Sequence, residues 1–305
     1  MSLDLSKLAT EGRLAESMEI DLASTAQILQ TINDQDRLVA EAVGRELPQI
    51  ARAVDLIADR LKQGGHLIYI GAGTSGRLGV VDAAEVHPTY GTGSELVQGL
   101  IAGGREAVFG AKEGAEDDPE LGRADVLQHV QPGDVVVGIA ASGRTPYTLG
   151  ALKTAKELGC ATVAVTNNAG SPMAAVADVA VSPVVGEEVI MGSTRMKAGT
   201  AQKLVLNMLS TAAMIKLGKV YTNLMVDMPC TNEKLYLRAE RMVMLATGAD
   251  QPAARAALQR CDHHTKTAIV SLLAEVAPET ARKALAAADG FVRRAIALAA
   301  AEPAQ

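Results

Sequence analysis

A glycine-rich loop with hydroxyl side chains is the stretch of this sequence best suited to anion chemistry. It reads Gly71-Ala72-Gly73-Thr74-Ser75-Gly76-Arg77 and lies between the apolar run 67–70 and the segment 78–85. Glycines let the backbone turn tightly and approach a ligand closely, and the free N–H groups that open a following helix favour an anion. The loop lacks the Gly-Lys-Ser/Thr ending of a nucleotide P-loop and matches the dinucleotide glycine pattern only loosely. It is therefore either a phosphate-binding loop or a turn that only joins a strand to a helix.

A second segment repeats the same chemistry further along the chain. It reads Ala141-Ser142-Gly143-Arg144-Thr145-Pro146-Tyr147-Thr148, and its proline is well placed to start a helix. Two Ser-Gly-Arg loops at strand ends would bring hydroxyls, backbone N–H groups and guanidinium groups to one anion from two sides. The alternative is that the two serines are unrelated helix caps.

Two further clusters contain side chains that can do chemistry. The stretch 111–119 reads Ala-Lys-Glu-Gly-Ala-Glu-Asp-Asp-Pro, which composition alone explains as carboxylates gathered at a helix start. The stretch Cys261-Asp262-His263-His264 contains possible metal ligands. Adjacent histidines point to different faces of a helix, and no further Cys or His lies at ligand spacing. We therefore predict no metal site.

The overall composition restricts the possible partners. The chain has 305 residues, 48% of them apolar and only 2% aromatic, and a formal net charge of −6. Nucleic-acid binders need basic surfaces and aromatic stacking platforms, which this composition does not supply. The start has no signal-peptide layout, and the longest low-charge run, 201–215, is too short and polar to span a bilayer. Three widely separated cysteines form no C-x-x-C pair, so we expect a soluble cytoplasmic protein with no nucleic-acid or membrane partner.

The elements that must position these loops follow from hydrophobic periodicity. Residues 24–62 show helical spacing, with Pro48 opening a second helix and Gly64-Gly65 closing it. Short apolar runs then alternate with helical segments, which is typical of a parallel sheet covered on both faces, an α/β fold in three layers. Ligands of such sheets bind beyond the carboxyl ends of the strands. The expected strands are 66–70, 96–102, 135–140, 162–165 and 179–182.

We predict three segments along the chain. Residues 1–45 form an N-terminal helical arm, in which the polar residues 1–20 drape over a neighbour. Residues 46–230 form the sheet domain, and the segment 192–200 opens a long helix that runs to Leu217. Residues 231–305 have no strand pattern and form a small C-terminal helical domain.

Three motifs together resemble one enzyme family. They are Gly-Ala-Gly-Thr-Ser-Gly-Arg-Leu at 71–78, Ala-Ser-Gly-Arg-Thr-Pro-Tyr at 141–147 and Gly-Ser-Thr-Arg-Met-Lys-Ala-Gly-Thr at 192–200, and the likeness continues through 218–227 and 231–234. The pattern is similar to that of the N-acetylmuramic acid 6-phosphate etherases, which are built on the sugar isomerase (SIS) fold. The glucokinase regulatory protein is a relative of that family. The resemblance covers nearly the whole chain and thins at both ends.

The resemblance implies an activity and its catalytic groups. The family cleaves the D-lactyl ether of N-acetylmuramic acid 6-phosphate with water, giving N-acetylglucosamine 6-phosphate and D-lactate, in peptidoglycan amino-sugar recycling or catabolism. Its two acidic residues fall on Glu85 and Glu116. We assign Glu85 as the acid for the leaving lactate and Glu116 as the base at C2, which is general acid–base chemistry that requires no metal or other cofactor.

The resemblance also implies a phosphosugar site in a homodimer, with active-site residues contributed by either copy. Ser75, Ser142 and Thr145 match the phosphate-loop positions of SIS domains, and Arg144 would bind the phosphate or the lactyl carboxylate, or else make a salt bridge. Two other functions stay open: a phosphosugar-sensing regulator of the glucokinase-regulatory type and an aldose–ketose isomerase. Further expected contacts are Thr74 and the backbone of Gly143 for the phosphate, and Asn223 and Lys197 for the sugar.

Overall fold

The computed structural model describes residues 9–110 and 112–301, and these form two compact units. One unit comprises the chain up to Ala84 together with Ser94–Ser210, and the other comprises Glu85–Gly93 with the chain from Thr211 onward. The outermost residues of the predicted arm and of the predicted C-terminal domain, 1–8 and 302–305, lie outside the described residues.

The first unit is built on a parallel sheet of five strands in the order β2-β1-β3-β4-β5. The chain steps from β1 to β2 on one side and to β3 on the other, so the strand order reverses beside β1. The predicted strands are confirmed, with ends that differ by at most one residue. The strands are β1 (Leu67–Gly71), β2 (Val97–Ile101), β3 (Val135–Ala140), β4 (Ala161–Thr166) and β5 (Val179–Val181).

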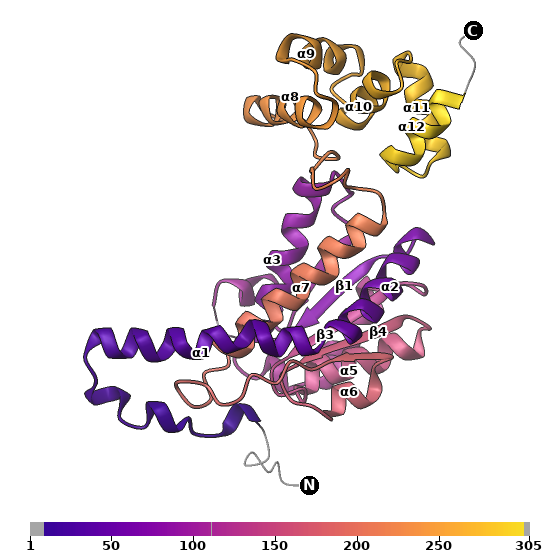
Figure 1. Cartoon of the computed structure of the whole chain (residues 1–305). Helices are drawn as coiled ribbons and strands as arrows, with labels where there is room; N and C mark the ends of the chain where they lie inside the picture. The colour runs from indigo at the N-terminus through magenta and orange to yellow at the C-terminus, as the bar shows by residue number, and fades with distance from the viewer. Residues whose placement is uncertain (1–8, 111, 302–305) are drawn as a thin grey trace. The chain divides into compact units, whose positions relative to one another are not determined.

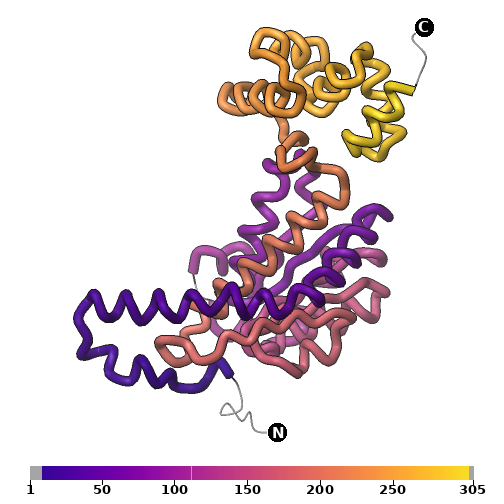
Figure 2. Tube along the Cα trace, in the orientation of Figure 1, coloured from indigo at the N-terminus to yellow at the C-terminus, as the bar shows by residue number. Residues whose placement is uncertain are grey.

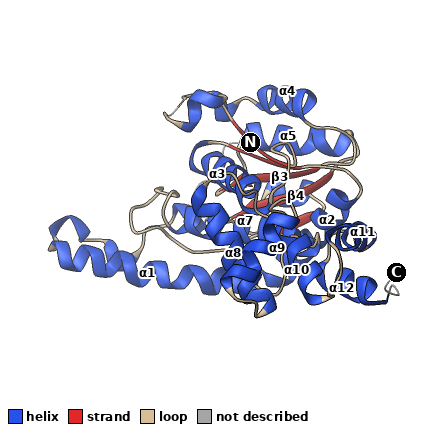
Figure 3. Ribbon diagram, turned by 90° about the horizontal axis from the view of Figure 1, so that it is seen from above, coloured by secondary structure: helices blue, strands red, loops and turns tan. Residues whose placement is uncertain are grey.

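Helices cover both faces of the sheet, as the continuous apolar strands require. Figure 3 shows α4 and α5 on one face of the sheet, and α2, α3 and α7 lie on the other (Figures 1 and 3). Ile68 and Ile70 of β1 are fully buried in the core under α4 and α5. Tyr69 points the opposite way, toward Gly79 of α3. The helices are α2 (Leu47–Lys62), α3 (Gly73–Tyr90), α4 (Pro119–His129), α5 (Pro146–Glu157), α6 (Pro172–Val176) and α7 (Lys197–Lys216).

The segment before the sheet begins with short helical turns and continues as the long helix α1 (Thr25–Arg45). Figure 2 shows the chain reversing direction before it enters α1. Ser24 starts the helix through a reciprocal capping box with Gln27, which satisfies two backbone N–H groups. Pro48 lies in the first turn of α2, as predicted.

A buried carboxyl group joins the sheet to the helices on one face. Asp82 of α3 accepts hydrogen bonds from the Tyr69 hydroxyl at 2.9 Å, Asn207 Nδ2 at 2.6 Å and the Ser210 hydroxyl at 3.2 Å. Burial, and then the neighbouring Asp82, raise the pKa of Tyr69 well above its ordinary value. This shift favours the neutral phenol, which donates its O–H to Asp82.

The second unit is helical, with its own apolar core. It contains α8 (Glu233–Thr247), α9 (Gln251–Arg260), α10 (Thr265–Leu273), α11 (Pro278–Ala287) and α12 (Val292–Ala301). The sequence argument against a metal site treated His263 and His264 as neighbours on one helix, whereas they lie between α9 and α10. Asp262 and His263 have positive φ, and His264 instead caps α10 by accepting a hydrogen bond from the Thr267 N–H. Among the residues described, no helix is both long and apolar enough to cross a membrane.

We predict that Tyr69→Phe destabilises the first unit by about 1–3 kcal/mol, because Asp82 would lose one of its buried donors. Thermal or urea unfolding followed by circular dichroism measures this change. Tyr236→Phe is the matched control: that ring is partly exposed, and its hydroxyl makes no hydrogen bond within the described residues. A loss for Tyr69→Phe no larger than for the control would show that the Asp82 network contributes little.

Candidate functional site

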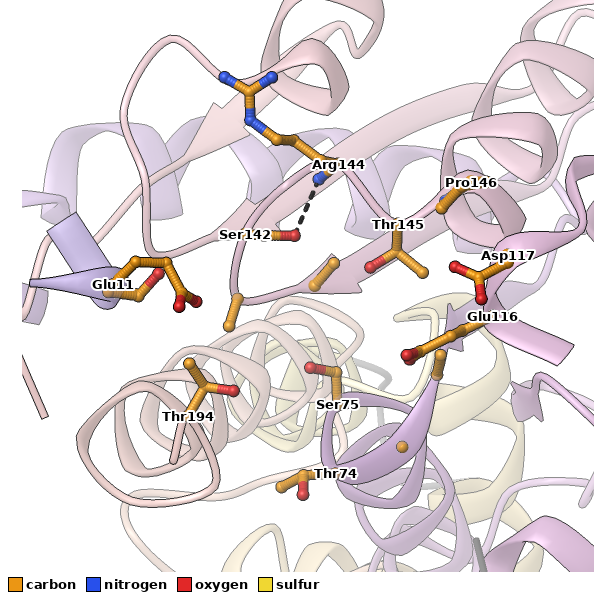
Figure 4. A pocket seen from close by; sticks show the side chains of 15 residues that line it. Glu11, Thr74, Ser75, Glu116, Asp117, Ser142, Arg144, Thr145, Pro146 and Thr194 are labelled. Carbon is orange, nitrogen blue, oxygen red and sulfur yellow. Dashed lines mark hydrogen bonds between the residues drawn. The ribbon is translucent and has the colours of Figure 1, made fainter. Parts of the chain in front are cut away.

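A cavity of about 450 Å³ lies at the carboxyl ends of β1 and β3, where the strand order reverses. In parallel sheets this is the expected place for a ligand. Both loops singled out in the sequence reach it, together with residues of the acidic stretch 111–119, of the motif 192–200 and of an N-terminal segment that was not singled out (Figure 4). The lining residues are Thr10, Glu11, Ala72, Gly73, Thr74, Ser75, Glu116, Asp117, Ala140, Ala141, Ser142, Arg144, Thr145, Pro146 and Thr194.

The first loop makes a sharp passage from β1 into α3. A Cβ on Gly76 would lie 2.6 Å from the carbonyl oxygen of Gly71, so only glycine fits there. Ser75 in the first turn of α3 is almost fully buried, and its hydroxyl donates to Gln202 Oε1 at 2.9 Å. Gln202 in turn donates to Asn167 Oδ1, which follows β4. This buried chain of hydrogen bonds fixes the Ser75 side chain at the cavity wall.

The second loop is held in place by the loop after β4. Gly143 has a φ of +65°, and a Cβ there would lie 2.3 Å from the Ser171 hydroxyl oxygen. The Gly143 carbonyl accepts from the Met173 N–H, and the Ala141 carbonyl accepts from Asn168 Nδ2. These contacts hold the loop in a conformation that turns the Ser142 and Thr145 side chains toward the cavity (Figure 4).

Two helices begin at this cavity. The first turn of α3 starts at Gly73, and α5 starts at Pro146 directly after Thr145. The Thr145 side chain makes no capping hydrogen bond, so it leaves the first N–H groups of α5 free. Unpaired N–H groups at helix starts, with hydroxyls beside them, are suited to binding a phosphate.

The two arginines of the Ser-Gly-Arg motifs do not converge on the cavity as expected. The Arg77 guanidinium donates to the carbonyls of Ala107 and Val108, at 2.8 and 3.0 Å, and so supports the loop after β2. Arg144 lines the cavity, but its guanidinium points away from the hydroxyls of Ser142 and Thr145 (Figure 4). The loops are alike in sequence, yet the anion-binding groups they present are neutral.

The acidic stretch divides into structural and cavity-facing residues. Asp118 caps α4 by accepting from the Glu120 N–H at 2.8 Å, which is the role that composition suggested for the whole stretch. Glu116 and Asp117 lie one turn earlier and line the cavity. Figure 4 shows the carboxyl groups of both side chains directed into it. Gly114 reaches this turn through a left-handed φ of 78°.

Three other predicted residues do not line this cavity. Glu85 is exposed on α3, about 15 Å along the helix from Ser75 at 1.5 Å per residue. Asn223 is exposed in the tight turn closed by Tyr221 and Leu224. Lys197 is 2% exposed, and its Nζ donates to Gln35 Oε1 of α1 at 2.7 Å. Burial lowers the pKa of the Lys197 ammonium.

Sequence reasoning missed the contribution of the N-terminal segment. Ala9 N–H donates to Asn168 Oδ1 at 2.8 Å, and Asn168 Nδ2 lies 3.2 Å from the Thr10 hydroxyl. These contacts place Glu11 in the cavity wall, on its own chain's site. No local periodicity signals them, because the partners are more than 150 residues apart in sequence.

The start of α7 also reaches the cavity, through Thr194. Its helix N-terminus is occupied by the buried carboxylate of Glu188, which accepts from the backbone N–H groups of Lys197 and Ala198 at 3.0 and 2.9 Å. Of the helix starts near the cavity, those of α3 and α5 remain available to a ligand.

Comparison with models of protein families shows which class of domain this fold and site belong to. The model of the SIS domain matches residues 115–212, and that of the glucokinase regulatory protein N-terminal SIS domain matches residues 49–156. Between them these matches span the sheet and both strand-end loops. The first unit is therefore built around a SIS domain.

Individual relatives extend the likeness over almost the whole chain. An N-acetylmuramic acid 6-phosphate etherase of Symbiobacterium thermophilum is 66% identical over 274 residues, which cover 90% of this chain and 91% of that protein. The N-acetylmuramic acid 6-phosphate etherase of Salinibacter ruber is 56% identical, over 96% of this chain and 95% of that protein. N-acetylmuramic acid 6-phosphate etherase 2 of Vibrio parahaemolyticus is 54% identical, over 97% of this chain and 99% of that protein. The chain belongs to the N-acetylmuramic acid 6-phosphate etherase family.

We predict that Gly143→Ala weakens binding of inorganic phosphate by tenfold or more, about 1.4 kcal/mol, because the Cβ would push the loop off Ser171 and strain a left-handed backbone. Isothermal titration calorimetry measures the affinity. Gly44→Ala in α1 is the control, since its Cβ would meet nothing within 4 Å. Equal phosphate affinity in both variants would contradict a phosphate role for the loop.

Proposed function

We propose that this chain cleaves the D-lactyl ether of N-acetylmuramic acid 6-phosphate with water, giving N-acetylglucosamine 6-phosphate and D-lactate. The observation that carries the proposal is the cavity at β1 and β3, where two phosphate-type loops and the carboxyl group of Glu116 face one space. Relatives at more than half identity are named for this activity. We further propose a cytoplasmic setting, in amino-sugar catabolism or cell-wall recycling.

The phosphate would bind between the two loops. Ser142 and Thr145 supply hydroxyls, with Thr74 at the rim, and the starts of α3 and α5 supply N–H groups. Ser75 would join them by turning its O–H from Gln202 to the phosphate. Hydrogen bonds to a charged phosphate are each worth about 1.5–3 kcal/mol. Several such bonds hold C6 in place, so that C2 and C3 of the sugar lie in the remaining space of the cavity.

The chemistry that remains is proton transfer. In the open-chain sugar the C2 proton lies α to the C1 aldehyde, so a carboxylate can remove it, and the C3 ether oxygen can then leave as lactate with a proton from an acid. Addition of water to the unsaturated aldehyde reverses these roles. We propose Glu116 as the base at C2 and Glu85 as the acid for lactate.

We propose that Glu85 acts from a second copy of the chain. It is exposed on α3 and lies well along the helix from the cavity-lining turn of its own chain. A homodimer in which α3 of one copy approaches the cavity of the other would bring both carboxyl groups to one substrate. Asn223, also exposed, could reach the sugar in the same way.

A second candidate is phosphosugar sensing without turnover, because residues 49–156 match the glucokinase regulatory protein model. That match covers the fold and the phosphate loops, which binding and catalysis would share. An aldose–ketose isomerase on the same fold would move a proton between C1 and C2 and release no lactate. D-lactate production from the purified protein distinguishes the etherase from both alternatives.

We predict that Glu116→Gln abolishes both D-lactate release and exchange of the substrate C2 proton with solvent deuterium, since an amide cannot accept that proton. Proton NMR in deuterium oxide follows the exchange, and an enzyme-coupled assay follows lactate. Glu113→Gln, an exposed neighbour outside the main cavity, is the matched control. Exchange at the wild-type rate in Glu116→Gln would remove Glu116 from the role of base.

We predict that mixing Glu85→Gln and Glu116→Gln subunits restores activity that neither variant has alone. If Glu85 acts across the dimer, each mixed dimer holds one intact site, so random exchange of subunits would return about a quarter of wild-type activity. The measurement is lactate release after the two variants are refolded together. No recovery, in samples shown by tagged pull-down to contain mixed dimers, would mean that Glu85 acts within its own chain or not at all.

A further inference from the structure

A third carboxyl group faces the cavity, and the proposed reaction assigns it no role. Glu11 lines the cavity from the N-terminal segment, on the side opposite Glu116 and Asp117 (Figure 4). Its side chain is partly exposed and makes no hydrogen bond or ion pair within the described residues. Glu11 is therefore free to interact with whatever occupies the cavity.

The backbone around Glu11 is fixed in place. Thr10 is 1% exposed, and the Asn168 side chain contacts both the Ala9 N–H and the Thr10 hydroxyl. The same side chain donates to the carbonyl of Ala141, the first residue of the second phosphate loop. Asn168 thus sets the position of Glu11 relative to the groups that would hold the phosphate.

The proposed elimination needs a step for which no group has yet been named. It starts from the open-chain aldehyde, whereas a hexose phosphate in water exists mainly as a closed ring. Opening the ring moves a proton from the C1 hydroxyl, O1, to the ring oxygen, O5. Both oxygens are bonded to C1, so one carboxyl group can contact the two together.

We propose that Glu11 is the catalytic residue that opens the sugar ring before elimination, an inference that rests on the proposed function. One carboxylate oxygen of Glu11 takes the proton from O1, the O1 electron pair forms the C1=O1 double bond, and the C1–O5 bond breaks. The same carboxyl group then delivers that proton to O5, the oxygen released when the C1–O5 bond breaks. Glu11 ends the step as the carboxylate with which it began, so the step needs no other reactant.

The location of Glu11 favours it over the other acidic residues. Asp117 adjoins Glu116 on the same turn and therefore on the wall where the C2 base acts. Glu11 approaches from the opposite wall, which leaves the sugar between the two groups. Glu16 and Glu19 of the same N-terminal segment are exposed and do not line the cavity.

The test measures how the rate of lactate release depends on enzyme concentration, in the wild type and in Glu11→Gln. Wild-type velocity of lactate release should rise in proportion to enzyme. Glu11→Gln should be about 100-fold slower at equal low concentration, in the range that general acid–base groups contribute. Its velocity should then level off as enzyme is added, at the spontaneous ring-opening rate of the substrate, because it acts only on sugar that opens unaided.

The control variant is Glu19→Gln, which should match wild type throughout. Glu11→Asp, which keeps a carboxyl group, should recover some of the linear dependence. A Glu11→Gln velocity that is lower but strictly proportional to enzyme would assign Glu11 a merely structural role and overturn the proposal. An unchanged velocity would also overturn it, and the same levelling-off in Asp117→Asn alone would transfer the role to Asp117.

A second measurement needs no variant and no lactate chemistry. Wild-type protein should accelerate interconversion of the α and β anomers of N-acetylglucosamine 6-phosphate, measured by exchange NMR. Interconversion no faster than in buffer would overturn the ring-opening role even if lactate is released. Faster interconversion without lactate release from the ether substrate would support ring opening and refute the proposed function, so the two failures are distinguishable.

Discussion

The site depends on backbone N–H groups that have no partner inside their own helices. A parallel sheet brings the ends of β1 and β3 to one edge, and α3 and α5 both start there. Each helix must leave its first N–H groups unpaired, and the glycine at each loop lets the backbone come close enough to present them. The buried link from Ser75 through Gln202 to Asn167, and the contacts of Asn168, keep the two loops in register. The remaining features of the cavity are arranged around this pair.

Much of this arrangement could be predicted from local sequence, because strands and helix starts have short-range signals. The apolar runs in the sequence predicted β1 and β3, and the two Ser-Gly-Arg loops were expected at the ends of these strands. The direction of the Arg77 side chain could not be predicted, since it depends on carbonyls supplied by the distant loop after β2. The break at 261–264 was missed because it has no glycine or proline to mark it.

The cavity places carboxyl groups beside groups suited to binding an anion. The two are compatible because the hydrogen-bond donors for the anion are neutral. Hydroxyls and N–H groups are neutral, so they can hold a phosphate without fixing Glu116 as a permanently paired anion. A lysine or arginine in their place would form an ion pair with nearby carboxylates and lower their pKa values. Arg77 is occupied by backbone carbonyls, and the Arg144 guanidinium points elsewhere. Carboxyl groups in such a setting can both take up and release protons.

The capped start of α7 leaves one helix N-terminus near the cavity without free N–H groups for a ligand. Glu188 already occupies the N-terminus that lies behind Thr194, so the chain itself supplies the negative charge at that helix. A sugar with one phosphate needs only the starts of α3 and α5. A sugar bisphosphate would bring a second charged group into a cavity where the third helix is closed by a buried carboxylate and where Glu11 and Asp117 add like charge. The cavity therefore offers a second phosphate fewer free N–H groups and more like charge than it offers the first.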